Sequence, residues 1–414
     1  MDERVPWKES DPVSERLEFV KRWLDGERVV DLCREFGISR KTAYKIRARY
    51  EELGPRGLFD LPRARKTQSR RTPPEVEQAV LALRAKHPTW GPLKLEASLR
   101  RRQPGIRVPS SATIGKILER NNVVRRRCRR KTYTPYQSPL REALAPNDIW
   151  CADFKGQFKL GNGRYCYPLT ITDRYSRVII RCEALENAKC DPAIAVFDQA
   201  FREYGLPTVI RTDNGVPFAA RGLWALSRLS VHWLRLGIWP ERIAPAHPEQ
   251  NGQHERMHLV LKQETTRPPG MNILQQQERF DRFVDVYNDE RPHEALEQRP
   301  PRELYARSPK QFPSELPVPE YPLHDEARRV HSNGQLWLEK GHCFKLTAAL
   351  AGETIGMREV EGNRCLVTFM QLDLGHYDFN TKLFEPNALP DWKERTAHRT
   401  RELMHLTSPI HEEC

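Results

Sequence analysis

The stretch HPEQNGQHERMHLVLKQE, residues 247–264, decides the fold of the middle of this chain. It predicts a loop that passes directly into a helix, because Pro248 disfavours helix before it and Asn251 is a good N-cap. Residues three, four and seven apart share one face of a helix, and this spacing groups Glu255, His258, Leu259 and Lys262. A Glu near a Lys on a helix is usually an ordinary exposed pair. Glu255 therefore indicates a functional site only if other carboxylates of the chain lie close to it.

Two aspartates upstream of this helix lie on predicted strands, in WCADFKG and in PTVIRTDNG. Asp153 points to the opposite face from Asp148 if both lie on one strand, because side chains alternate. Asp213 ends its strand, where open α/β sheets place their ligands. If the two strands are neighbours, Asp153, Asp213 and Glu255 can form one cluster. Asp173, inside TDRYS, fits a local turn better.

Three carboxylates without a set of Cys or His ligands favour Mg²⁺ or Mn²⁺ over Zn²⁺. Two such ions, about 3.5–4 Å apart, can activate an attacking hydroxyl and stabilise the leaving oxygen of a phosphodiester. The alternative is that each aspartate has only a local structural role, such as forming an Asx turn. The sequence predicts a site for two divalent ions held by Asp153, Asp213 and Glu255.

The positive charge is confined to one part of the chain. Residues 1–131 hold 33 Lys and Arg against 17 Asp and Glu, a net charge of +16, whereas the remainder carries −3. A localised basic excess predicts contact with a polyanion. The mean hydropathy of −0.71 and the lack of a long apolar stretch predict neither a membrane span nor a signal peptide. The nine cysteines are scattered without a C-x-x-C pair, which indicates a reducing compartment.

The basic third begins with a predicted helix-turn-helix. The turn Gly37-Ile38-Ser39 separates VVDLCREF from RKTAYKIRARYEEL, and a Gly, an apolar residue and a Ser N-cap suit a turn between crossed helices. The helix after the turn would lie in the DNA major groove. Its candidate DNA contacts are Arg40, Lys41, Tyr44 and Lys45. Three helices packed for another purpose remain the alternative.

Further DNA contacts are expected along the chain. The basic segment 62–73 contains two prolines and predicts an extended arm that follows the minor groove, or a linker without a fixed site. Residues 74–122 predict a second helix-turn-helix. The candidate contacts in these segments, and on the helix of the opening stretch, are Arg63, Arg65, Lys66, Ser111, Thr113, Lys116, His258 and Lys262.

The composition changes at Asp148. Three meandering strands with turns at 161–163 and 173–174 are followed by strands that alternate with helices, including a helical run from about Ala219 to Arg235. A helical segment 272–307, broken at ERPHEAL, comes next. This pattern predicts a mixed sheet covered by helices. After the Pro-rich segment 311–322, short strands with glycines at their turns predict a small all-β barrel or sandwich.

We therefore expect a multidomain chain with all-α helix-turn-helix units, an α/β core and a small all-β domain. The expected divisions are a first helix-turn-helix domain (1–60), a basic arm (61–73), a second helix-turn-helix domain (74–131), a linker (132–147), the core (148–308), a Pro-rich linker (309–325), a small β-barrel (326–390) and a tail (391–414).

Three motifs, WCADFKG, RTDNGVPF and HPEQNGQHERMH, resemble as a set the signatures of the integrase-type core of DDE transposases, which has an RNase H-like fold. The order of domains is similar to that of bacterial insertion-sequence transposases over nearly the whole chain. The resemblance implies that Asp153, Asp213 and Glu255 are the catalytic triad. It implies metal-dependent cleavage at the ends of an element, followed by attack of the freed 3′-hydroxyl on target DNA.

The resemblance also implies partners and a location. Double-stranded DNA is the expected partner, as terminal repeats of the element and as target. Joining two ends needs two active sites, so we expect a homodimer or a higher homo-oligomer on DNA. The expected location is the bacterial cytoplasm, at the nucleoid.

The third carboxylate departs from the spacing in retroviral relatives. Between Asp213 and Glu255 lie 41 residues, whereas Glu249 would leave 35, the retroviral spacing. Glu255 is preferred because Gly252-Gln253-His254-Glu255 aligns with the Gly-x-x-Glu of the family. A His-His-Cys-Cys zinc module is missing from the N-terminal sequence, which favours transposases over retroviral integrases. The rival interpretations are a non-enzymatic DNA-binding regulator derived from a transposase, and a nuclease of the same fold that only hydrolyses.

Overall fold

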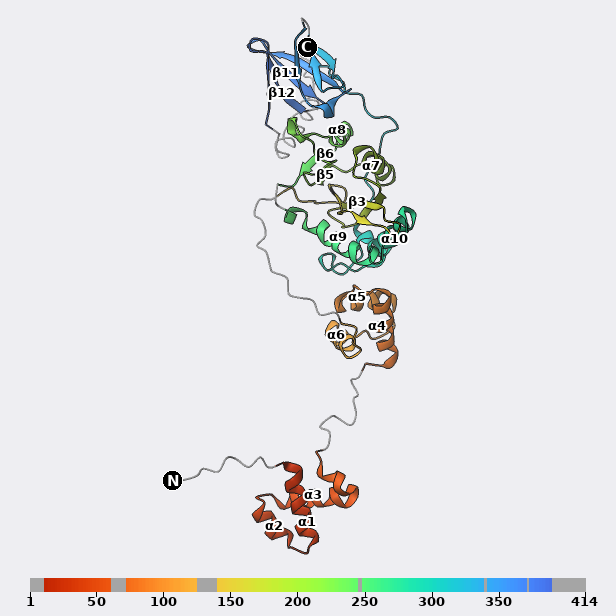
Figure 1. The fold of residues 1–414 in the computed structure, drawn as a ribbon, viewed down its shortest axis with the longest axis vertical. Helices are drawn as coiled ribbons and strands as arrows, with labels where there is room; N and C mark the ends of the chain where they lie inside the picture. Colours follow the sequence, from red (N-terminus) through yellow and green to blue (C-terminus); the bar gives the residue numbers. More distant parts are fainter. Residues whose placement is uncertain are drawn as a thin grey trace, which may run out of the picture. The chain divides into compact units, whose positions relative to one another are not determined.

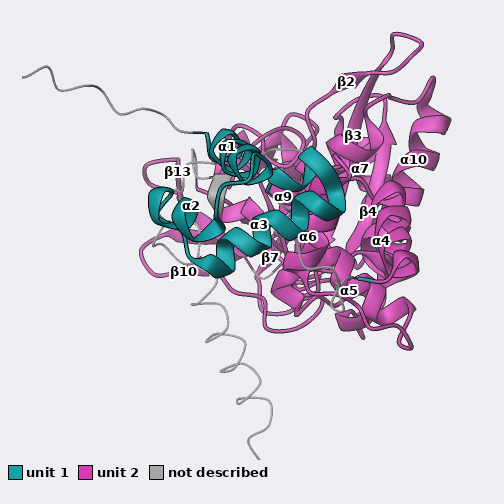
Figure 2. Cartoon of the chain, turned by 90° about the horizontal axis from the view of Figure 1, so that it is seen from below, with its two compact units in different colours: residues 1–72 teal, residues 73–414 magenta. Residues whose placement is uncertain are grey.

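The computed structural model describes residues 11–60, 72–124, 140–244, 248–338, 341–370 and 372–388. The chain divides into two compact units, residues 1–72 and residues 73–414 (Figure 2). Within the described ranges, no helix has the length and the apolar content that a bilayer crossing requires.

The first unit is a bundle of three helices. It contains α1 (Pro12–Leu24), α2 (Val29–Glu35), α3 (Arg40–Leu53) and a closing 3₁₀ turn, Gly54–Leu58. Ser39 caps α3 by accepting a hydrogen bond from the backbone N of Thr42 (3.1 Å). Gly37 has φ +61°, the left-handed conformation that the turn before α3 requires. The two helices and the turn between them match the expected helix-turn-helix.

The second unit begins with three more helices, α4 (Pro74–Lys86), α5 (Pro92–Arg102) and α6 (Ser111–Arg120). Each of the first two has a proline in its first turn, where the missing N–H costs nothing. Their shared core contains Val80, Trp90, Leu95, Leu99, Ile114 and Ile117.

A mixed sheet forms the centre of the second unit (Figure 1). Its strands are β1 (Ile149–Phe154), β2 (Phe158–Lys159), β3 (Tyr165–Asp173), β4 (Ile179–Leu185), β5 (Val209–Thr212) and β6 (Trp239–Arg242). The antiparallel pairs are β2–β3, β1–β3 and β3–β4, and the parallel pairs are β1–β5 and β5–β6. The expected meander therefore has four strands rather than three, because a short pair closes the hairpin around the turn at 161–163.

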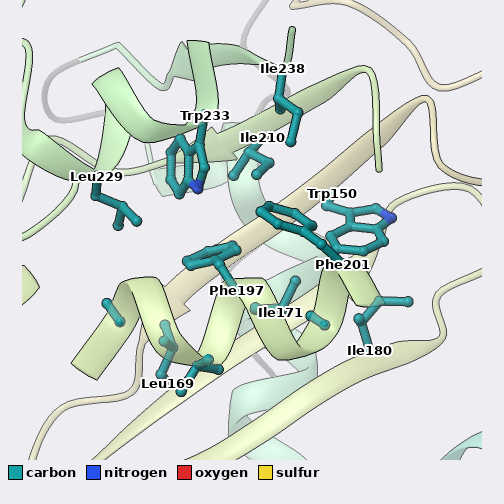
Figure 3. Packing of buried hydrophobic residues seen from close by; sticks show 14 of the residues in the cluster. Trp150, Leu169, Ile171, Ile180, Phe197, Phe201, Ile210, Leu229, Trp233 and Ile238 are labelled. Carbon is teal, nitrogen blue, oxygen red and sulfur yellow. The ribbon is translucent and has the colours of Figure 1, made fainter. Parts of the chain in front are cut away.

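Helices cover both faces of the sheet. On one face, α7 (Cys190–Tyr204) and α8 (Arg228–Arg235) pack in a cluster with Trp150, Ile171 and Ile210. Figure 3 shows Phe197 and Phe201 directed towards the tryptophans of this cluster. On the other face, α9 (Gly252–Thr265) and α10 (Ile273–Asp285) pack in a second cluster with Cys166, Ile179 and Cys182.

Two predicted helical segments are shorter than expected. After α10 the chain makes one π-helical turn, Val286–Glu290, and then only the 3₁₀ turns Glu294–Leu296 and Pro301–Leu304, because Pro292 and Pro300 cannot continue a helix. Helix was also expected from Ala219, but before α8 there is only the 3₁₀ turn Leu223–Ala225. Gly222, with φ +124°, interrupts that segment.

The C-terminal part is antiparallel β-structure. One sheet has the order β13-β12-β11-β10-β7, and a separate hairpin pairs β8 with β9. The strands are β7 (Glu326–Arg329), β8 (Gln335–Trp337), β9 (Cys343–Lys345), β10 (Thr354–Val360), β11 (Arg364–Phe369), β12 (Leu372–Asp378) and β13 (Leu383–Pro386). Among the described strands, β13 and β7 are edges, so the sheet is open. Its core includes Leu226, Val231 and Leu234 from around α8.

We expect Phe197→Ala to lower the free energy of unfolding of the second unit by about 3–5 kcal/mol, because it leaves a cavity between α7 and the sheet. Phe197 is fully buried, and its ring centroid lies 4.9 Å from that of Trp233. Calorimetry of the full chain measures the change. Leu274→Ala is the control, because Leu274 is 77% exposed, and an equal effect of both changes would contradict the described core.

Candidate active site

The parallel pairing of β1 with β5 sets two aspartates side by side. Cys151 pairs with Arg211 in the register of the two strands. Asp153 and Asp213 each follow two residues later, and residues two apart in a strand point to the same face. Asp213 comes directly after β5 and accepts a hydrogen bond at Oδ1 from the N of Gly215 (3.0 Å). A Cβ at Gly215 would lie 3.1 Å from Asp213 Oδ2, so a glycine suits this turn.

The third carboxylate, Glu255, lies in the first turn of α9. Burial, together with the negative charges of Asp213 and Glu255, raises the pKa of Asp153 to about 7. The nearby cation Lys155 opposes this increase. Asp213 and Glu255 are thus both close enough to act on the charge of Asp153. Glu249 lies in the 3₁₀ turn Pro248–Asn251 that precedes α9.

Two buried histidines of α9 lie beneath Asp153. Thr170, which is opposite Asp153 in the β1–β3 register, has its Oγ1 2.7 Å from His254 Nε2 and 2.6 Å from His258 Nε2. The same hydroxyl donates to the backbone oxygen of Asp153 (3.1 Å). Thr172 Oγ1 lies 2.9 Å from the other ring nitrogen of His254, Nδ1. A hydroxyl from β3 therefore joins the backbone of Asp153 to α9.

The hydrogen positions in this network follow from counting donors. Burial lowers the pKa of His254 to about 3 and also lowers the pKa of His258, so each ring is neutral and carries one N–H. If the single proton of the Thr170 hydroxyl goes to the Asp153 carbonyl, we assign both imidazoles as Nε2–H donors to Thr170. His254 Nδ1 then accepts from Thr172. His258 Nδ1 keeps a lone pair that has no hydrogen-bond partner and lies 3.6 Å from Asp153 Oδ2.

The donor set fits a divalent cation. Within the described part of the chain, the group of possible ligand atoms that lie within 4.8 Å of one another comes from Asp153, His254 and His258. Both nitrogens of His254 are engaged by threonines, whereas the lone pair of His258 and a carboxylate oxygen of Asp153 face each other. Two lone pairs in contact are favourable only with a proton or a cation between them. A cation here would also reduce the repulsion from Asp213 and Glu255.

The residues that are expected to contact DNA differ in their exposure to solvent. Arg40, Lys41, Tyr44 and Lys45 are exposed at the start of α3, and Lys116 and Lys262 are exposed on α6 and α9. Ser111 and Thr113 are half-buried, and Ser111 N donates to Glu96 (2.6 Å). Arg63, Arg65 and Lys66 lie outside the described residues. His258 is only 1% exposed, so the expectation that it contacts DNA is corrected.

The sequence contained a signal for the burial of these histidines. The buried residues of α9 are His254, Met257, His258, Leu261 and Thr265. Their spacing of three and four residues defines the packed face of a helix. The face drawn through Glu255 and Leu259 is rotated from it by one residue. Thr170 was missed because it belongs to none of the three motifs, and His254 was missed, although it lies inside HPEQNGQHERMH, because the functional face was drawn through Glu255.

Comparisons with known proteins identify the parts of the chain. Residues 15–66 match a helix-turn-helix domain model, and residues 42–118 match a homeodomain-like domain model. Residues 143–248 and 236–301 each match an integrase core domain model.

Among curated proteins, the chain is similar to uncharacterized proteins of bacterial insertion elements. It is 27% identical over 187 residues to a protein of IS407 from Burkholderia multivorans, covering 44% of this chain and 64% of the relative. It is 28% identical over 186 residues to a protein of IS476 from Xanthomonas euvesicatoria, covering 44% of this chain and 51% of the relative. The chain thus spans about half to under two thirds of the length of these two relatives.

Solved structures of retroviral integrases are also similar. The catalytic core domain of HTLV-2 integrase in complex with magnesium is 16% identical, with a TM-score of 0.33, covering 40% of this chain and 100% of that chain. A simian T-cell lymphotropic virus intasome in complex with a PP2A regulatory subunit is 15% identical, with a TM-score of 0.37, covering 75% of this chain and 100% of that chain.

We expect Thr170→Val to lower the free energy of unfolding by about 1–3 kcal/mol for each imidazole N–H that it leaves buried without an acceptor. Thr170 is fully buried, so water cannot replace its hydroxyl without rearrangement. Chemical denaturation of the full chain measures the change. Thr170→Ser keeps the hydroxyl and is the matched control. If valine and serine were equally tolerated, the described hydrogen-bond network would be wrong.

Proposed function

We propose that this chain, an insertion-element protein with helix-turn-helix domains ahead of an RNase H-like integrase core, is a DDE-type transposase. It would cleave DNA at the ends of its element and join the freed 3′-hydroxyls to target DNA. The observation that carries the proposal is the raised pKa of Asp153, to which both Asp213 and Glu255 contribute. A buried carboxyl group with two further carboxylates nearby is costly for stability alone, and groups with perturbed pKa values cluster at functional sites.

We propose that Asp153, Asp213 and Glu255 hold Mg²⁺ or Mn²⁺, as two ions, because hard cations prefer carboxylate oxygens. When bound, such ions supply charge stabilisation for the attacking and leaving oxygens of a phosphodiester. The side chain of Asp153 is 16% exposed. Its position is maintained by the Thr170 hydroxyl on its backbone and by the rigid packing of α9. Lys155 and the exposed Lys262 would lie on the side from which a phosphate approaches.

The helical units supply the proposed DNA recognition. The exposed basic residues at the start of α3 suit the major groove of the terminal repeats. Two ends must be joined for each event, and the described residues of one chain hold a single cluster of the three carboxylates. The proposed active form is therefore a homodimer or a higher homo-oligomer on DNA.

Each of Asp153→Asn, Asp213→Asn and Glu255→Gln should lower cleavage and strand transfer by at least about 10³-fold, while leaving DNA binding intact, because the amide keeps the shape but not the charge. A strand-transfer assay on paired element ends, with Mg²⁺ and with EDTA, measures this. The double change Asp153→Asn/Glu255→Gln should be scarcely worse than either single change.

Glu249→Gln is the matched control for the third carboxylate and should retain substantial activity. An inactive Glu249→Gln beside an active Glu255→Gln would move the third ligand to Glu249. Hydrolysis without any strand transfer by the wild-type protein would instead indicate a nuclease. DNA binding with neither reaction would indicate a regulator.

Mg²⁺ should raise the Tm more at about pH 8 than at about pH 5.5, because metal binding must displace a proton from a carboxyl group. The folded-state pKa of Asp153 is raised to about 7. In metal-free protein, this group therefore contributes stability below its ordinary pKa, and that contribution is lost as the pH rises through about 7. Asp153→Asn should remove both the pH dependence and the Mg²⁺ effect. An equal Mg²⁺ effect in wild type and variant would place the metal elsewhere.

A further inference from the structure

A basic cavity lies beside the candidate active site and has His254 in its lining. Its volume is about 70 Å³, several times the roughly 10–15 Å³ that one water requires. His254 and Cys151 line it, and Cys151 precedes Asp153 by two residues, or about 7 Å along β1. The polar residues that define the cavity are Lys94, Arg174, Arg177, Arg256, Arg291 and His293.

The cations of this cavity are not balanced by carboxylates. Arg291 pairs with Glu264 at 3.2 Å. Asp173 also lines the cavity, but its carboxylate is engaged by the N of Asn147 (2.8 Å) and by the N and hydroxyl of Ser176 (2.7 and 2.6 Å). Across the described residues, the other four cations have no carboxylate oxygen within 4.0 Å. They are Lys94, Arg174, Arg177 and Arg256.

Burial and mutual repulsion act together on these cations. Burial, together with the charge of Arg291, lowers the pKa of Lys94 to about 7, although the carboxylates of Glu264 and Glu294 oppose this decrease. Burial likewise lowers the pKa of Arg177, with contributions from Arg256 and Arg174. Positive charges brought together in this way are unfavourable unless an anion joins them.

A buried histidine adds an unpaired donor or acceptor to the same cavity. His293 is 8% exposed, and its Nε2 has no hydrogen-bond partner. Its backbone is fixed in a tight turn, where its N donates to the Arg299 carbonyl (3.2 Å) and its carbonyl accepts from Gln298 (2.8 Å). This residue belongs to the ERPHEAL segment, whose helix break turns both Arg291 and His293 into the cavity.

We propose that this cavity binds one backbone phosphate of DNA, adjacent to the strand that is held at the carboxylates. The inference rests on the proposed function and assigns a role to the ERPHEAL segment. Arginine side chains and an N–H donor suit the oxygens of a phosphate. The cavity lies about two strand residues from Asp153, within reach of a neighbouring phosphate of the same duplex. Lys94 belongs to α5, so the bound phosphate joins the helices of residues 74–122 to the core.

The test compares Lys94→Met and Arg174→Gln with Arg164→Gln. Methionine keeps the apolar stem of Lys94 without its charge. Arg164, whose side chain is 77% exposed at the β2–β3 turn, is the matched control with the same loss of charge. Affinity of the full chain for a duplex of fixed mixed sequence is measured in EDTA against salt concentration. Binding without metal separates this test from the catalytic proposal, which fails only if strand transfer fails.

Each cavity variant should bind DNA roughly ten- to a hundredfold more weakly than the control, because it loses a charged hydrogen bond. The slope of log affinity against log salt should fall by up to about 0.9 for a lost phosphate contact. Without DNA, the cavity variants should have a Tm at or above that of wild type, because a repelling charge is gone. A structural role alone would lower the Tm and leave the salt slope unchanged.

Inorganic phosphate, tested against chloride at equal ionic strength, distinguishes the source of the phosphate. If it raises the Tm of wild type but not of Lys94→Met, and DNA affinity matches the control, the site takes free phosphate and the DNA assignment is overturned. Equal loss of affinity in Arg164→Gln and in the cavity variants would also overturn it, because the effect would then be general charge.

Discussion

The parallel pairing of β1 with β5 is the constraint on which the site depends. Parallel strands can be neighbours only when a long connection returns the chain to the same end of the sheet. Here the connection contains β3, β4 and α7, and its packing is completed by the aromatic cluster around Trp150. Once the register is fixed at Cys151 and Arg211, the chain has no freedom to separate Asp153 from Asp213. The hydrophobic core therefore determines the distance between charges that repel.

The proximity of these carboxylates raises the free energy of the folded state. The buried pair Arg211 and Glu241 (Nε to Oε2, 2.5 Å) lies on β5 and β6 just before Asp213, and it adds a second demanding polar contact to the same strands. Polar groups in low dielectric are tolerated where every member has a partner. His258 Nδ1 has no hydrogen-bond partner and lies 3.6 Å from Asp153 Oδ2, which locates the incomplete part of the network beside the Asp153 carboxylate. The groups around Asp153 thus lower the stability of the fold, as is usual for groups at functional sites.

The sequence was sufficient for the order of elements and for placing Asp153, Asp213 and Glu255 at two strand ends and a helix start, because each position has its own local signal. Gly37 marks its turn by a left-handed backbone conformation and Ser39 marks the start of α3 by a capping hydrogen bond, whereas Asn251 precedes α9 without a side-chain capping bond. The contact of His254 with Thr170 could not be predicted, since it joins residues 84 positions apart and depends on how α9 is rotated against β3. The same holds for Arg174 and Arg291, which meet only after α10 ends in its π turn. Helix length after residue 290 was overestimated because apolar periodicity was given more weight than two prolines.

Helix α8 has a consequence for how the chain can be divided. Leu229 and Trp233 pack in the cluster of the central sheet, while Val231 and Leu234 pack in the cluster of the C-terminal strands, so the helix has two apolar faces. A fragment ending after residue 308 would expose that second apolar face to water, which favours self-association. The C-terminal β-structure thus covers an apolar surface of the integrase core domain. Loss of the C-terminal β-structure would therefore require polar residues in place of Val231 and Leu234 on α8.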